Sequence, residues 1–160
     1  MQAVLDRAAT LGERLRARGE TIAVSESSSG GLVSAALLAL PGASAYFMGG
    51  AVTYTTTARG VLVGIRPEQM VGLRSSSEPY AALLARTMRE RMGTTWGLAE
   101  TGASGPTGNR YGDAAGHSCL AISGPVDLVR TLETGSAERW PNMLEFALAT
   151  LGLLDEALSA

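Results

Sequence analysis

Two loops rich in hydroxyl and glycine residues are the parts of this chain best equipped for chemistry. Residues 25–31 read Ser-Glu-Ser-Ser-Ser-Gly-Gly after the apolar run 21–24, and residues 101–108 read Thr-Gly-Ala-Ser-Gly-Pro-Thr-Gly at the end of the run 96–101. Free N–H groups at the start of a helix attract anions. They also stabilise the oxyanion that forms when a serine attacks an acyl carbon. Residues 25–31 are therefore a candidate phosphate or oxyanion site, and residues 101–108 are a candidate site for a phosphate or a ribose.

Both loops also have ordinary explanations. A serine before a helix is a routine N-cap, and the local sequence of residues 25–31 alone favours capping. Residues 101–108 are not a G-x-x-x-x-G-K-[ST] loop, because the chain has no lysine and all 13 of its basic residues are arginine. That segment can be a plain connection, although loops of its length are more often functional and its donors suit a phosphate or a ribose.

Other reactive side chains offer less. His117 is the only histidine, and we expect it to be structural rather than a general base. Cys119, the only cysteine, excludes an internal disulfide, and its apolar neighbours predict a buried, inert thiol. Tyr80 and Tyr111 have no supporting neighbours in the sequence. Neither paired carboxylates nor a His/Cys/carboxylate cluster shows metal-ligand spacing, so we expect no metal and no cofactor.

The composition indicates one globular domain covering residues 1–160. Hydrophobic residues make up 46% of the chain, and the net charge of −2 gives no basic surface for nucleic acid or an anionic membrane. The charged N-terminus lacks the apolar core of a signal peptide, and no run reaches the roughly 18–20 apolar residues of a membrane span. We expect a cytoplasmic homo-oligomer that binds a small nucleotide and neither nucleic acid nor membrane.

Helical and strand patterns alternate along the chain. Helices are predicted for residues 4–18, 30–40, 78–91 and 138–158, with a short one ending at residue 62. Strands are predicted for residues 21–24, 96–101, 117–123 and 127–134, and within 46–57. Gly124-Pro125 joins two of these strands as a hairpin, which favours a mixed sheet. The alternation predicts a three-layer α/β domain with its ligand at the carboxyl ends of strands, where both loops lie.

Several short motifs, in order and in register, resemble the CinA C-terminal domain family, the nicotinamide-nucleotide amidases. The family's A-E-S-C-T-G-G stretch corresponds to residues 25–31. Its later motifs P-G-[SA]-S, G-G-x-V-x-Y, T-G-x-A-G-P and G-D-R correspond to residues 41–44, 49–54, 101–106 and 137–139. The resemblance extends from about residue 20 to residue 158, nearly the whole chain.

The resemblance implies an α/β/α fold with a mixed sheet of about five strands. It also implies hydrolysis of the carboxamide of nicotinamide mononucleotide to the acid and ammonia, with Ser27 as the nucleophile. Tyr54 and Arg59 are the further catalytic candidates in this chain. Ser28, Ser29 and the glycine N–H groups would shape the oxyanion site. The implied substrate-binding residues are Ser28, Ser29, Gly30, Gly31, Thr101, Gly102, Gly105, Thr107 and Arg139.

The chain departs from the family at two positions. The family reads Y-[ST]-x-x-x-K, and its lysine serves the serine as base, whereas this chain carries Arg59. A guanidinium stays protonated and cannot accept the serine proton. The arginine expected one turn after G-D-R is replaced by Met143.

Two readings follow from these departures. In one, the chain remains a serine hydrolase: Arg59 lowers the pKa of Tyr54, whose phenolate is the base, or it steers the ligand phosphate. In the other, the chain is a nucleotide-binding relative that has lost the amidase reaction. Both readings expect loops 25–31 and 101–108 to face each other across one pocket, with Tyr54 and Arg59 projecting into it.

Overall fold

The chain folds around a mixed five-stranded sheet, seen in a computed structural model that describes residues 1–160. The strands are β1 (Ile22–Glu26), β2 (Phe47–Val52), β3 (Trp96–Ala103), β4 (His117–Ser123) and β5 (Leu128–Glu133). They lie in the order β2-β1-β3-β4-β5. β1 is parallel to both β2 and β3, whereas β4 is antiparallel to β3 and β5 is antiparallel to β4.

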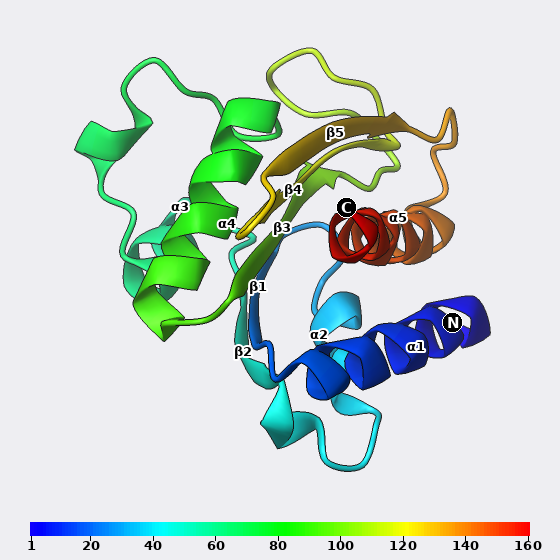
Figure 1. The fold of residues 1–160 in the computed structure, drawn as a ribbon. Coiled ribbons are helices and arrows are strands. Elements are labelled where there is room, and N and C mark those ends of the chain that lie inside the picture. The colour runs from blue at the N-terminus through cyan, green and yellow to red at the C-terminus, as the bar shows by residue number, and fades with distance from the viewer.

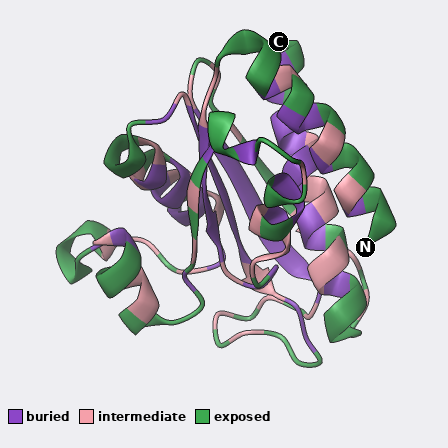
Figure 2. Cartoon of the chain, turned by 90° about the horizontal axis from the view of Figure 1, so that it is seen from below, coloured by how far each residue is buried: buried purple, intermediate pink, exposed green.

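Helices cover both faces of the sheet, which gives three layers (Figure 1). On one face lie α1 (Gln2–Arg18), α2 (Leu32–Leu38) and α5 (Arg139–Ser159), and on the other lies α4 (Glu78–Met92). Shorter turns connect these elements: η1 (Ala43–Ala45), α3 (Thr56–Ala58), η2 (Arg59–Val63) and η3 (Pro67–Met70). Figure 2 shows the strands buried between helices whose outer surfaces are exposed. The predicted α/β/α domain with a mixed sheet is confirmed.

The side-chain alternation of the strands divides the core into two parts. Large residues such as Ile22, Val24 and Leu98 point to the layer of α1, α2 and α5 and belong to a cluster of 22 buried residues. Small residues on the opposite face point to α4, in a cluster of 12: Ala23, Ala99, Cys119 and Ala121. Successive residues of a strand face opposite sides, so the size difference sets how closely each helix layer approaches the sheet.

The approach of α4 to the sheet is close enough to require a glycine. A Cβ built on Gly97 of β3 would lie 1.9 Å from the carbonyl oxygen of Ala85 in α4. No side chain fits at that distance, because the backbone of the helix itself would have to move. Gly97 therefore fixes the spacing between α4 and β3.

α1 ends, and α4 begins, at the residues that the sequence predicts. Gly19 follows α1 in the left-handed conformation, with φ 64°, which favours glycine over residues with a Cβ. Ser77 caps α4 by accepting the N–H of Tyr80, and Pro79 lies in the first turn of that helix. α1 and α4 match their predicted ranges closely.

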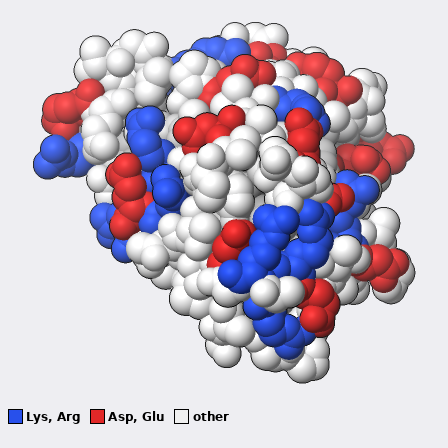
Figure 3. Space-filling model, in the orientation of Figure 1, with Lys and Arg blue, Asp and Glu red and all other residues white.

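The carboxyl ends of β1, β2 and β3 lie at one edge of the sheet, because these strands are parallel. The antiparallel β4 begins at the same edge. Figure 3 shows acidic and basic side chains interspersed over one face of the molecule, with basic ones gathered over α1. In that cluster Arg14, Arg16 and Arg18 pair with acidic side chains. None of the helices has the length and apolar character that crossing a membrane would take.

Candidate functional site

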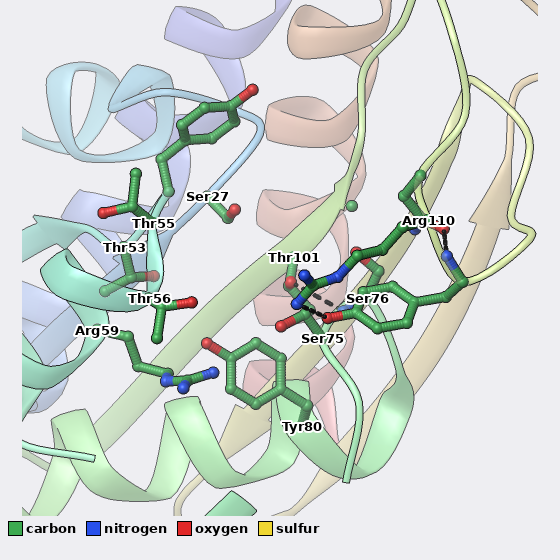
Figure 4. Close-up of a pocket in the computed structure, with 14 residues that line it drawn as sticks. Ser27, Thr53, Thr55, Thr56, Arg59, Ser75, Ser76, Tyr80, Thr101 and Arg110 are labelled. Carbon is green, nitrogen blue, oxygen red and sulfur yellow. Dashed lines mark hydrogen bonds between the residues drawn. The ribbon is translucent and has the colours of Figure 1, made fainter. Parts of the chain in front are cut away.

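A cavity of about 260 Å³, here called the Ser27 cavity, opens at this edge of the sheet and is lined by 14 residues. Its walls come from the turn after β1, the segment that follows β2, the approach to α4, and the loop between β3 and β4. Figure 4 shows Ser27, Arg59, Tyr80 and Thr101 around one space. The two loops identified in the sequence therefore meet across one cavity, and Tyr54 and Arg59 line it as expected.

Ser27 is the first residue after β1, and it lines the cavity. Its backbone N–H donates to Oε2 of Glu100 at 3.0 Å, and its carbonyl accepts the N–H of Gly30 at 3.2 Å. Hydrogen bonds of both its N–H and its carbonyl thus fix the backbone of Ser27. The hydroxyl itself forms no bond to another side chain, which leaves it available to a ligand.

Glu100, a fully buried residue of β3, holds the Ser27 turn from below. Its Oε2 accepts the backbone N–H of Ser29 at 2.8 Å in addition to that of Ser27. Its Oε1 accepts the hydroxyls of Ser28 at 2.5 Å and Ser118 at 2.9 Å. The sequence reasoning missed Glu100. The available signal is a lone carboxylate inside an apolar strand, because a buried charge requires several donors.

The positions of Ser28 and Ser29 correct one expectation. Both are buried and neither lines the cavity; the Ser29 hydroxyl lies 2.8 Å from Glu26 and 2.9 Å from Glu100. Their hydroxyls are committed to the two carboxylates, so they do not shape an oxyanion site. They position the turn that carries Ser27.

The start of α2 corrects a second expectation. Glu26, also fully buried, accepts the N–H groups of Gly31 at 3.1 Å, Val33 at 2.9 Å and Ser34 at 2.8 Å. These are the groups expected to hold a ligand anion, and Gly30 and Gly31 lie outside the cavity lining. The anion site at this helix start is absent, because the chain fills it with its own carboxylate.

The loop after β3 contributes to two neighbouring hollows. Thr101 and Gly102 line the Ser27 cavity. A Cβ on Gly102 would lie 2.3 Å from the carbonyl oxygen of His117, so the close pairing of β3 and β4 requires glycine there. Gly105 and Thr107 instead line an adjacent hollow, which shares Tyr54 and Gly102 with the cavity.

Tyr54 and Arg139 meet at the boundary between the two hollows. The Arg139 guanidinium donates to the Tyr54 hydroxyl at 3.2 Å and to the carbonyl of Gly105 at 2.6 Å. It also lies over the Tyr54 ring, 5.9 Å from the centroid. The cation beside Tyr54 is therefore Arg139 and not Arg59, the residue that the sequence predicts there.

Arg59 lies against Tyr80, with its guanidinium carbon 5.8 Å from the ring centroid. Burial raises the pKa of Tyr80, and the adjacent Arg59 partly opposes that rise. The Nε atom of Arg59 is buried and has no hydrogen-bond partner. At this corner the cavity offers a cation and a neutral phenol, both of them hydrogen-bond donors.

A third corner holds residues that the sequence reasoning left aside. The Arg110 guanidinium donates to the Tyr111 hydroxyl at 3.0 Å, and this hydrogen bond lowers the pKa of Tyr111. Arg74 lies over the same ring, 5.5 Å from its centroid. The loop before α4 and the loop between β3 and β4 are brought together here, a contact that sequence spacing does not reveal.

His117 and Cys119 lie outside the cavity, as their sequence context predicts. Burial would disfavour a charged His117 ring, but hydrogen bonds to Glu133 and to the carbonyl of Ser76 outweigh it and raise the pKa of His117. Burial raises the pKa of the Cys119 thiol. Neither residue faces the space in which a ligand would bind.

The chemical character of the cavity follows from its lining. Ten of the 14 lining residues carry a hydroxyl group, two are arginines, and none is acidic, histidine or lysine. Such a surface donates and accepts many hydrogen bonds and favours negative charge. It suits a small anionic ligand rich in hydroxyl groups.

A comparison with protein families agrees with the motifs along the chain. The model of the CinA C-terminal domain matches residues 5–158. This chain belongs to the CinA C-terminal domain family. CinA-like proteins of Trichormus variabilis and Myxococcus xanthus are 36% identical over 126 residues and 40% identical over 118 residues. The matches cover 79% and 74% of this CinA C-terminal domain, which spans only 30% and 28% of those curated relatives.

Solved structures share the fold of this CinA C-terminal domain over nearly its whole length. The competence/damage inducible protein CihA of Agrobacterium tumefaciens superposes with a TM-score of 0.89 and 26% identity, covering 99% of this chain and 96% of that one. A CinA superfamily protein of Klebsiella pneumoniae superposes with a TM-score of 0.90 at 22% identity, covering 98% of both chains.

Proposed function

We propose that this CinA C-terminal domain is an amidohydrolase that deamidates nicotinamide mononucleotide or a related amide with Ser27 as nucleophile. The observation that carries the proposal is the position of Ser27 in a cavity lined by arginines and hydroxyls and free of acidic side chains. Such a cavity suits a phosphorylated, ribose-containing amide. Family membership supports the same substrate class.

The proposed reaction begins with attack of the Ser27 hydroxyl on the carboxamide carbon. The proton of Ser27 passes to a base, the nitrogen leaves as ammonia after gaining a proton, and water then cleaves the acyl-serine to give the carboxylate. The N–H groups of Ser27 and Ser29 already donate to Glu100, and that of Gly31 donates to Glu26. Arg59 and Tyr80 on the cavity wall are side-chain donors for the developing oxyanion.

The reaction needs a base that accepts the proton of Ser27, and no lysine, histidine or carboxylate lines the cavity. Arg59 cannot accept a proton, so a tyrosine of the cavity has to do so. Tyr54, whose hydroxyl accepts a hydrogen bond from Arg139, is the candidate that the sequence reasoning names.

A second candidate function is binding of the nucleotide without hydrolysis. The observation that favours it is the lack of lysine, histidine and carboxylate among the lining residues, which leaves the cavity well built for an anion and poorly built for proton transfer. In this reading the domain senses or carries a nucleotide and the Ser27 hydroxyl contacts the ligand.

One pair of measurements separates the two functions. Ammonia release from nicotinamide mononucleotide is followed beside calorimetric binding of the same compound, for the wild type and for Ser27→Ala. Hydrolysis lost in Ser27→Ala with binding retained supports the amidohydrolase. Binding by both proteins with no ammonia from either supports the binding function, and absence of binding contradicts both.

A further inference from the structure

The charge of the Ser27 cavity is one-sided. Arg59 and Arg110 line it, neither belongs to an ion pair, and no aspartate or glutamate lines it. The two carboxylates behind the turn, Glu26 and Glu100, already accept several hydrogen bonds each and face inward. The arginines of the cavity wall are thus left for the anionic groups of a ligand.

Arg59 is the arginine of the cavity wall that has a buried nitrogen without a hydrogen-bond acceptor. Figure 4 shows its guanidinium beside the hydroxyl end of Tyr80, with Ser27 lining the same cavity. Its Nε is buried without an acceptor, and its neighbour Tyr80 offers a hydroxyl from a ring that is itself buried. A buried donor without a partner is unfavourable. The guanidinium that carries this Nε lines the cavity and belongs to no ion pair, so it is left for an acceptor on the ligand.

We propose that the Ser27 cavity binds the carboxylate form of its ligand more tightly than the carboxamide form, with Arg59 as the partner of the carboxylate. The inference rests on the proposed function, in which the acyl carbon of the ligand lies at Ser27. It adds a preference between the two sides of the reaction: the cavity of this chain is complementary to the deamidated compound.

The reason lies in the donors that each form would meet. A guanidinium only donates hydrogen bonds, and a carboxylate accepts two of them in a planar fork. A carboxamide has one oxygen acceptor. Its NH₂ group is itself a donor and cannot accept a hydrogen bond from the guanidinium. The deprotonated acid also carries the charge that balances Arg59. A lysine ammonium at position 59 would attract the carboxylate only as a point charge, without the planar pair of hydrogen bonds. The full preference for the carboxylate form therefore depends on arginine.

The preference changes how the domain behaves during the reaction. Hydrolysis converts the amide and water into a carboxylate and ammonium. The nitrogen leaves, while the new carboxylate stays opposite Arg59. The product is then held more tightly than the substrate, so the deamidated nucleotide inhibits the reaction or is the ligand that the domain retains.

A ligand phosphate is the other anion that Arg59 could meet, and a set of four compounds separates the two. These are the acid and the amide of the mononucleotide, and the acid and the amide of the riboside that lacks phosphate. The ratio of acid to amide affinity measures the carboxylate contact, and the ratio of nucleotide to riboside affinity measures the phosphate contact. Isothermal titration calorimetry supplies all four values.

For the wild type we expect the acid to bind at least 10-fold more tightly than the amide, with and without the phosphate. Arg59→Met should reduce that ratio to below about 2-fold, and Arg59→Lys should leave an intermediate ratio. The matched control is Arg66→Met, because Arg66 is an exposed arginine away from the cavity. It should keep the wild-type ratio. Thermal melting of each variant establishes that it is folded.

Three results would overturn the inference. The first is equal affinity for acid and amide, and the second is absence of binding by all four compounds. The third is an Arg59→Met variant that loses the ratio of nucleotide to riboside affinity but keeps the ratio of acid to amide affinity. The proposed hydrolysis stands apart from these outcomes. Acid preference without ammonia release contradicts the hydrolysis alone, and ammonia release without acid preference contradicts this inference alone.

Discussion

The carboxylate of Glu100 lies 3.0 Å from the backbone nitrogen of Ser27, although the two residues are 73 positions apart in the chain. This contact joins the turn after β1 to the middle of β3, under the floor of the cavity. It means that the conformation of the Ser27 turn depends on a charge in a neighbouring strand.

Glu100→Ala should lower the free energy of unfolding by more than about 3 kcal/mol, because each buried donor left without an acceptor costs about 1–3 kcal/mol. Glu100→Gln should cost less, about 1–2 kcal/mol. Its amide oxygen can keep the two N–H groups, while the hydroxyls of Ser28 and Ser118 can turn to accept from its NH₂. Chemical denaturation measures both values.

The control for this prediction is Glu156→Gln. Glu156 pairs with Arg130 at the surface, and exposed ion pairs contribute only about 0–1 kcal/mol. An equal loss of stability in Glu156→Gln and Glu100→Ala would mean that Glu100 does not hold the turn.

Arg59→Lys should raise the rate of ammonia release from nicotinamide mononucleotide. A half-buried amine can have its pKa lowered by burial, lose its proton near neutral pH and act as base, which a guanidinium cannot do. General-base catalysis is worth about 10²–10⁴-fold, so even partial restoration of the base should exceed a 10-fold gain. A discontinuous ammonia assay under saturating substrate measures the gain.

Two controls accompany this experiment. Ser27→Ala in the Arg59→Lys background should abolish the gain, since the new base would have no hydroxyl to activate, and Arg66→Lys should leave the wild-type rate unchanged. A wild type as fast as Arg59→Lys would show that another group accepts the proton, and Tyr54→Phe then tests the tyrosine at the boundary with the adjacent hollow.

The fold was largely predictable because local signals agreed with the packing. Gly19 ends the first helix in the left-handed conformation that it favours, and the run 117–123 is recovered unchanged as β4. The role of the buried Glu100 was not predictable in the same way. Glu100 becomes a partner of the Ser27 turn only after β1 and β3 pair, and no spacing along the chain encodes that contact.

The cavity shows the same division. Ser27, Tyr54, Arg59 and Thr101 follow from motifs and from the rule that loops at strand ends collect ligands. Tyr111 reaches the same space only through the contact between two loops, with Arg74 and Arg110 against its ring. Side chains that converge by loop-to-loop contact are hidden from single-sequence reasoning.

The His117 ring should titrate above its ordinary pKa of 6.5 in the folded protein. Both ring nitrogens face acceptors, Glu133 and the carbonyl of Ser76, which favours the doubly protonated ring. Stabilisation from these contacts is therefore fully present below pH 6.5 and is lost as the pH rises through the higher folded value. Proton NMR measures this directly, because the chain has one histidine.

Glu133→Gln is the matched variant for the histidine titration. It keeps the size of the side chain and removes the charge, so the pKa of His117 should fall toward its ordinary value. A His117 resonance that titrates below pH 6.5 in the wild type would contradict the arrangement.

Cys119 should react with a thiol reagent only when the protein unfolds. Its side chain is buried under α4, and burial raises the pKa of the thiol, so little thiolate is present and access is blocked. Labelling with a chromogenic disulfide reagent should therefore proceed at the rate of opening. A Val129→Cys variant in a Cys119→Ala background supplies an exposed thiol on β5 that should react at once.

The long-range hydrogen bonds of the Ser27 turn have a kinetic consequence. β1 and α2 belong to the first 38 residues, but the acceptor that orders the turn between them arrives with β3 and is itself completed by Ser118 of β4. Contacts between distant segments form slowly, because the intervening chain must first be closed into a loop. We therefore expect the geometry of the Ser27 turn to be among the last features to form as the chain folds, so that a partly folded chain carries Ser27 without the ordered turn.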